Sequence, residues 1–81
     1  MSTSAISFDP SAIDVDVSDA LLRVTLADGR EVAAPLAWFP RLRDATPEQR
    51  RHWRLIGRGV GIHWPDVDED VSIRGLLGLP T

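Results

Sequence analysis

Six of the nine arginines lie between residues 41 and 58, where their guanidinium groups could bind phosphates or carboxylates. With Asp44 and Glu48 as its acids, this segment has a net charge of 6 − 2 = +4, although the whole chain has −3. A planar guanidinium suits either type of anion. Three interpretations stay open: a solvated helix face, a docking surface for an acidic protein, or a nucleic-acid patch. The acidic balance of the chain disfavours the last, because phosphate contacts dominate nucleic-acid affinity. The six residues are Arg41, Arg43, Arg50, Arg51, Arg54 and Arg58.

A histidine followed by alternating carboxylates could form a metal site in the second half of the chain. The residues are His63, Asp66, Asp68 and Asp70. A calcium loop beginning at Asp66 would need glycine at its sixth position and glutamate at its twelfth, where this chain has Val71 and Leu77. One histidine with carboxylates is also a poor zinc set. We therefore expect no metal and no cofactor, with the aspartates forming turns before a final helix.

The sequence contains no recognisable arrangement of residues for acid–base or nucleophilic catalysis. His52 and His63 are the two histidines, and neither belongs to a known nucleophile motif. His63 alternates with apolar residues, so we expect it to hydrogen-bond at the edge of the core. The glycines from Gly57 to Gly61 match neither phosphate-binding fingerprint. No catalytic residue is assigned, and the protein is expected not to be an enzyme.

Two tryptophan–proline segments, Pro35–Leu42 and Gly61–Asp70, flank the arginine cluster. They contain Trp38, Phe39 and Trp64, each followed closely by proline. These aromatic rings could pack in the core at strand ends. The alternative is a partly exposed aromatic patch at an interface.

The strands and helices that must position these residues can be predicted from the sequence, and they indicate an α+β fold with one small antiparallel sheet. Alternating apolar residues and the turn at Asp28-Gly29 predict a hairpin over residues 21–35. Further strands are expected near 13–17 and 60–64. Thr46, Pro47 and Gln49 form a capping box that begins one main helix over 47–56. Residues 66–70 are expected as an acidic loop, followed by a short C-terminal helix over 73–77.

The length and composition fit one small domain spanning residues 1–81, with residues 1–11 poorly ordered. The chain has no cysteine, so its core must hold by packing without disulfides. The N-terminus has no basic region or long apolar run typical of a signal peptide, and no segment reaches transmembrane length. We therefore expect a cytoplasmic protein.

In combination, these segments resemble the bacterial family known as domain of unknown function 2442. The resemblance covers roughly residues 12–78 and rests on five segments. These are the hairpin with Asp28-Gly29-Arg30, Pro35–Leu42, Ala45–Trp53, Gly59–Pro65 and Val67–Asp70 before Leu76-Leu77. It implies an α+β fold with no catalytic residues to transfer. The resemblance also implies a gene neighbourhood, since genes of this family are often placed beside another small family, numbered 4160, in arrangements similar to toxin–antitoxin pairs.

The resemblance and the arginine cluster together predict an interaction protein, similar to the antitoxin-like member of a two-gene module. Its partner is expected to be a small protein encoded nearby, with a homodimer as the alternative and no membrane partner. Some members of the family carry a helix-turn-helix domain, for which 81 residues leave no room, so nucleic acid is not the expected partner. A nucleic-acid-associated accessory protein is the alternative function. The expected contact residues are Trp38, Arg41, Arg50, Arg54 and Trp64.

Overall fold

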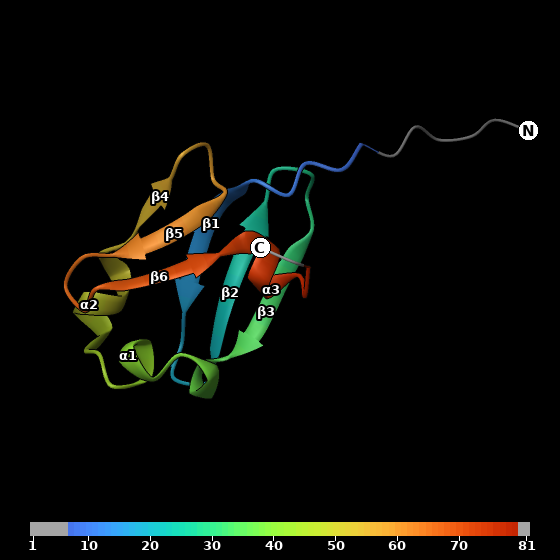
Figure 1. Cartoon of the computed structure of the whole chain (residues 1–81). Helices are drawn as coiled ribbons and strands as arrows, with labels where there is room; N and C mark the ends of the chain where they lie inside the picture. Colours follow the sequence, from blue (N-terminus) through green and yellow to red (C-terminus); the bar gives the residue numbers. More distant parts are fainter. Residues whose placement is uncertain (1–6, 80–81) are drawn as a thin grey trace, which may run out of the picture.

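The computed structural model describes residues 7–79 and shows two small antiparallel sheets joined by short helices (Figure 1). The α+β class expected from the sequence is confirmed. The expected single sheet is wrong, because the strand near residues 60–64 belongs to a second sheet of its own. No helix in the described part of the chain is long and apolar enough to cross a membrane.

Sheet A has the order β1-β2-β3 and contains the predicted hairpin. Its strands are β1 (Ala12–Val17), β2 (Leu21–Leu26) and β3 (Glu31–Pro35). Gly29 has φ +92° in the turn, a conformation that glycine adopts without strain. Because β2 is the central strand, its inward residues are fully buried, which explains the strength of its alternating pattern.

Three short helical segments connect the two sheets. They are the 3₁₀ helix η1 (Leu36–Trp38), α1 (Pro40–Arg43) and α2 (Pro47–Arg51). The predicted capping box is present at α2: Thr46 Oγ1 accepts from the amide of Gln49 at 3.1 Å, and Gln49 Oε1 accepts from the amide of Thr46 at 3.0 Å.

Sheet B, with the order β4-β5-β6, differs most from the sequence-based expectation. Its strands are β4 (Arg54–Ile56), β5 (Gly61–Trp64) and β6 (Glu69–Ser72), and α3 (Ile73–Leu76) follows. The predicted helix over 47–56 is therefore too long, because its last three residues form β4 and pair with β5. The predicted acidic loop over 66–70 is also too long, because Glu69 and Asp70 pair with β5 as part of β6.

The core lies between the two sheets, which pack face to face (Figure 1). Leu22, Val24 and Leu26 of β2 lie in the same buried cluster as Ile62 and Trp64 of β5. Each fully buried aliphatic side chain contributes about 1.5–3 kcal/mol. A protein of this size depends on a few such side chains, because its buried fraction is small.

The N-terminal segment is partly tied to the hairpin turn. The sequence predicts poor order for residues 1–11, of which 1–6 lie outside the described residues. The amide of Asp9 donates to Asp28 Oδ2 at 3.0 Å, and the oxygen of Ser11 accepts from the amide of Ala27 at 2.8 Å. Residues 9–11 are thus hydrogen-bonded to the turn of sheet A.

Candidate functional site

Trp38 is the largest side chain exposed on the surface, with 69% of its area accessible. The short helix η1 explains this orientation. A 3₁₀ helix places residues three apart on the same side, so Leu36 and Phe39 both face inward. The amide of Phe39 donates to the oxygen of Leu36 at 2.9 Å and closes the turn. Trp38 is thereby held outward on an ordered turn.

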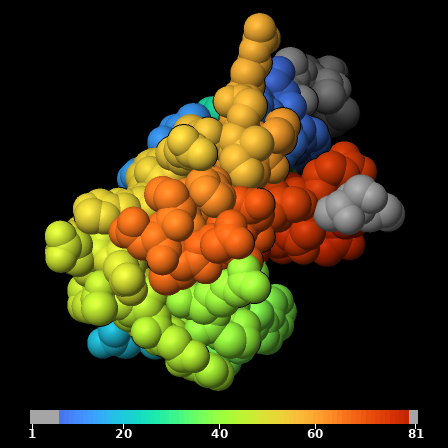
Figure 2. Space-filling model, turned by 60° about the vertical axis from the view of Figure 1, so that its left-hand side comes forward, coloured from blue at the N-terminus to red at the C-terminus, as the bar shows by residue number. Residues whose placement is uncertain are grey.

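A groove of about 350 Å³ lies beside Trp38, between η1, β6 and α3. Ser72 Oγ accepts from the amide of Gly75 at 2.8 Å and caps α3, so this wall is fixed by a hydrogen bond. Figure 2 shows the segment around residues 36–45 (green) meeting residues 60–72 (orange) on this side of the molecule. The groove is lined by Trp38, Phe39, Asp70, Val71, Ser72, Gly75 and Leu76.

The outer face of sheet B continues from this groove across all three strands. Arg54 of β4 pairs in register with His63 of β5, and His63 pairs with Asp70 of β6. His63 Nδ1 is hydrogen-bonded to Asp70 Oδ1, and 19% of the histidine side chain is exposed. His63 forms a hydrogen bond as predicted, but it lies on the outer face of the sheet and is not part of the core cluster. A row of polar side chains therefore runs from the exposed edge at Arg54 to the groove at Asp70.

Arg41 connects α1 to the turn between β5 and β6. Its Nη1 donates to the main-chain oxygen of Asp68, which has φ +52° in the left-handed region. Aspartate tolerates this conformation better than most residues. The side chain of Arg41 remains exposed. It thus holds the turn in place and stays accessible to a partner.

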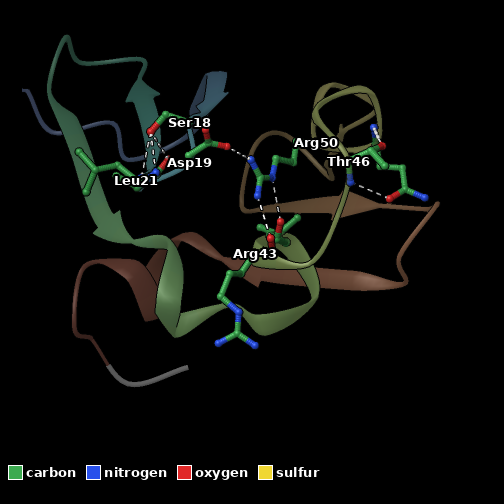
Figure 3. Close-up of polar contacts among 9 residues, drawn as sticks. Ser18, Asp19, Leu21, Arg43, Thr46 and Arg50 are labelled. Atoms are coloured by element: carbon green, nitrogen blue, oxygen red, sulfur yellow. Dashed lines mark hydrogen bonds and ion pairs between the residues drawn. The ribbon is translucent and has the colours of Figure 1, made fainter.

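Arg50 lies inside the fold, with 8% of its area exposed (Figure 3). Its Nε donates to the oxygen of Leu42 at 2.9 Å, and its Nη2 donates to the oxygen of Arg43 at 2.8 Å. Both oxygens are at the end of α1, where a cation also complements the helix dipole. Its Nη1 donates to Asp19 Oδ1 at 2.7 Å, which connects α2 to the β1–β2 turn.

Trp64 is completely buried. Its indole nitrogen donates to the main-chain oxygen of Arg50 at 3.1 Å. Of the five predicted contact residues, the structure therefore exposes Trp38, Arg41 and Arg54, and it places Arg50 and Trp64 in the interior, out of reach of a partner. The sequence did not indicate that α3 supplies one wall of the groove, because nothing in the local pattern around Gly75 and Leu76 marks them as surface residues beside Trp38.

The candidate metal ligands are separated: Asp66 pairs with His52, which is not one of them, and His63 pairs with Asp70. His52 Nδ1 is 2.9 Å from Asp66 Oδ2. Within residues 7–79, no group of three or more histidine, cysteine or carboxylate side chains is arranged to hold a metal. The pairs instead connect neighbouring elements, α2 to the β5–β6 turn and β5 to β6.

Two ion pairs perturb the pKa values of their members. Hydrogen bonds from the Arg30 side chain, first in importance, lower the pKa of Asp28 to about 2. In the same way, the side chain of Arg43 at the end of α1 lowers the pKa of Asp44, and the pKa of Arg43 is raised in return. Neither pair lines the groove, so they belong to the framework of the fold.

Comparisons with known proteins place the chain among proteins without an assigned activity. Residues 12–79 match the family described as "Protein of unknown function (DUF2442)". A crystal structure of a protein of unknown function from Rhodospirillum rubrum ATCC 11170 is similar, with a TM-score of 0.70 and 32% sequence identity. The match covers 85% of this chain and 87% of that one. No curated protein matches the chain.

Proposed function

The chain belongs to the DUF2442 family of proteins of unknown function, and we propose that it is a non-enzymatic module that binds a second protein through Trp38 and the adjoining groove. The observation that carries this proposal is the 69% exposure of Trp38 on an ordered turn beside a groove of about 350 Å³. Tryptophan and arginine are the residues that most often dominate the energy of protein interfaces. Trp38 has Arg41 three residues away, also exposed.

The polar groups around the groove support a binding role over a chemical one. Ser72 Oγ accepts the hydrogen bond that caps α3, and the carboxylate of Asp70 is bonded to His63. These groups hold the walls of the groove in place. A preorganised surface loses little conformational entropy on binding, which favours affinity.

The family resemblance points to a small protein encoded by the adjacent gene as the partner, in the manner of an antitoxin and its toxin. In this proposal, Trp38 inserts into the partner, while Arg41 and Arg54 contact it at the rim. Arg50 and Trp64 support the surface from inside through their hydrogen bonds to α1 and to each other.

Isothermal titration calorimetry with the purified product of the adjacent gene tests this proposal. We expect Trp38→Ala to weaken binding by about 10-fold or more, as at an interface hot spot. Phe8→Ala is the matched control, because Phe8 is an aromatic residue of similar exposure, 68%, that lies outside the groove. We expect its affinity to stay within about twofold of wild type. Equal losses in the two variants, or no complex with the wild-type chain, would overturn the proposal.

A nucleic-acid-associated role is the second candidate, and the arginines of residues 51–58 favour it. It predicts binding to DNA that weakens steeply with added salt. Exposed carboxylates lie nearby: Glu48 is three residues before Arg51, and Asp66 is paired with His52. Because these acids would repel phosphates, we rank this role second.

A further inference from the structure

The outer edge of β4 has no neighbouring strand among the described residues, and arginines that form no ion pair lie along it. β4 (Arg54–Ile56) pairs with β5 on one side, and no described strand pairs with its other side. A free strand edge carries main-chain N–H and C=O groups that can hydrogen-bond to an added strand. Figure 1 shows β4 at the periphery of sheet B.

Most described arginines bind a carboxylate or a carbonyl oxygen of the same chain. Arg23, Arg30, Arg43 and Arg50 each form an ion pair, and Arg41 donates to the oxygen of Asp68. By contrast, three arginines form no ion pair with any carboxylate in residues 7–79: Arg51, Arg54 and Arg58. These three lie at the end of α2, in β4 and in the β4–β5 turn, so they follow one edge of sheet B.

We propose that this edge accepts an acidic, extended segment of a partner protein as a fourth strand of sheet B. The inference rests on the proposed protein-binding function and identifies the chemistry of the partner. Peptides that add to a sheet edge gain affinity from main-chain hydrogen bonds and specificity from alternate side chains. Opposite charges directly across two strands attract, whereas like charges repel.

The register of β4 specifies the side chains that the added strand should carry. Arg54 and Ile56 are exposed on one face, whereas Leu55 between them packs against the core. An added strand would place a residue about 5 Å from each, measured between Cβ atoms. We therefore expect an acid opposite Arg54 and an aliphatic residue opposite Ile56, two positions apart. A second acid would lie near Arg58, beyond the end of β4.

Two other occupants fit this edge less well. A second copy of the chain could offer β1 as its acidic strand. There, however, the exposed aliphatic residue Ile13 directly precedes Asp14 at a β-bulge, and Val15 between Asp14 and Asp16 is buried, so β1 lacks an aliphatic residue two positions from an acid on its exposed face. Nucleic acid would use the arginines without using the strand backbone. Both occupants become outcomes of the test.

The test uses the full chain and the capped peptide acetyl-Thr-Glu-Thr-Val-Thr-Glu-Thr-amide, which places both acids and valine on one face. Binding is followed by the amide NMR signals of residues 54–56. We expect these signals to shift and Arg54→Gln to weaken binding at least fivefold, with Arg58→Gln acting in the same direction. Arg23→Gln is the control, because Arg23 is an exposed arginine in sheet A that already pairs with Glu31. Its affinity should stay within twofold of wild type.

Two altered peptides separate strand addition from simple charge attraction. The peptide acetyl-Thr-Thr-Glu-Val-Glu-Thr-Thr-amide has the same composition but puts valine and the acids on opposite faces, and it should bind at least threefold more weakly. Two N-methylated peptides, one modified at the odd-numbered and the other at the even-numbered residues, lose main-chain hydrogen-bond donors without a change in charge. These are the two phases of the modification. One of the two phases should abolish binding. Unchanged affinity in both phases would overturn the proposal.

Further outcomes would assign the edge to another occupant. Tighter binding of oligo-dT than of the acidic peptide would overturn the proposal in favour of nucleic acid. Concentration-dependent dimers that Arg54→Gln abolishes would overturn it in favour of a second copy. If the acidic peptide fails to bind but the adjacent gene product binds through Trp38, this inference fails and the proposed function stands. If the peptide binds through Arg54 while Trp38→Ala leaves the affinity for the adjacent gene product unchanged, the proposed function fails and this inference stands.

Discussion

The indole nitrogen of Trp64 donates a hydrogen bond to the main-chain oxygen of Arg50 at 3.1 Å, and both residues are buried. The guanidinium of Arg50 in turn holds the two last carbonyl oxygens of α1. This pair therefore links β5, α2 and α1 below the exposed surface that carries Trp38. Within residues 7–79, no buried side-chain nitrogen or oxygen lacks a hydrogen-bond partner.

The first prediction concerns the three hydrogen bonds of Arg50. Arg50→Lys keeps the charge, but an ammonium on a single stem cannot reproduce the three bonds of the fork. Because it would leave a buried oxygen unsatisfied, we expect the free energy of unfolding to fall by about 2–4 kcal/mol. Urea denaturation measures the change.

Two controls separate the buried contacts of Arg50 from its charge. Arg51→Lys alters an exposed arginine of the same helix and should stay within about 0.5 kcal/mol of wild type. Asp19→Ala removes the carboxylate, whose side chain is 97% exposed, and should cost no more than about 1 kcal/mol. Equal stabilities of the Arg50 and Arg51 variants would contradict the assigned role.

The second prediction compares the most buried tryptophan, Trp64, with the most exposed one, Trp38. Trp64→Phe removes the donor to Arg50 and leaves a small cavity, so we expect a loss of about 1.5–3 kcal/mol in the free energy of unfolding. Trp38→Phe alters a side chain that is 69% exposed and should change the stability by less than about 0.5 kcal/mol. Thermal and urea unfolding of both variants measure the contrast, and similar losses would contradict the burial described for the two residues.

Local signals in the sequence identified the hairpin and the start of α2 correctly. Each depends on neighbouring residues alone: Asp28-Gly29 can make a tight turn, and Thr46 with Gln49 can close a capping box. Such motifs are encoded by adjacent residues, so they can be recognised without knowing the tertiary contacts. For that reason they survive from the sequence to the structure.

The end of α2 and the second sheet depend on contacts that a local pattern does not show. Arg54–Ile56 could continue the helix, but pairing with Gly61–His63 makes them a strand. A three-residue strand is too short to show a period of two, and β6 has one buried apolar residue, Val71. Tertiary pairing therefore overrides the local propensity in both places.

The sequence predicted part of the candidate site, but it could not predict which of the contact residues are exposed, because exposure also depends on tertiary contacts. Trp38 and Trp64 have similar sequence surroundings, each close to a proline, yet one is exposed and the other is buried. Their burial is decided by the elements that hold them: an outward position of η1 and an inward position of β5. Likewise, Arg50 and Arg54 differ because only the former lies against the end of α1.

The third prediction concerns the pH dependence of the β2–β3 turn. The side chain of Arg30 and the main-chain amides of Arg30 and Asp9 donate to Asp28, whose pKa falls from 3.8 to about 2. Since the folded state favours the ionised carboxylate, this contribution to stability is complete above pH 3.8 and is lost as the pH falls through about 2. Carboxyl NMR titration should give the low pKa directly.

Variants of the turn provide the check on this prediction. In Arg30→Gln the pKa of Asp28 should rise towards its ordinary value, because the strongest hydrogen bond is removed. In Asp28→Asn, the loss of thermal stability between pH 4 and pH 2 should be smaller than in the wild type. An unchanged acid dependence in Asp28→Asn would show that other carboxyls account for it.

The last prediction compares two glycines that have nearly the same positive φ angle. Gly59 has φ +89° and Gly29 has φ +92°, so alanine at either position meets a similar backbone strain of about 1–2 kcal/mol. Their surroundings differ. A Cβ at Gly29 would meet nothing within 4 Å, whereas one at Gly59 would lie 2.8 Å from the nitrogen of Ala12 and close to its oxygen. The oxygen of Gly59 also accepts from the amide of Ala12 at 2.8 Å, which ties the β4–β5 turn to β1.

We therefore expect Gly59→Ala to destabilise the fold by at least about 1 kcal/mol more than Gly29→Ala, since Ala12 must also move. Urea denaturation of both variants measures the difference, and the common strain cancels in the comparison. The amide of Ala12 should also exchange its hydrogen faster in Gly59→Ala, because its hydrogen bond to residue 59 is weakened. Equal stabilities of the two variants would mean that the turn can move away from β1 without cost, and that sheet B is not anchored to sheet A at this point.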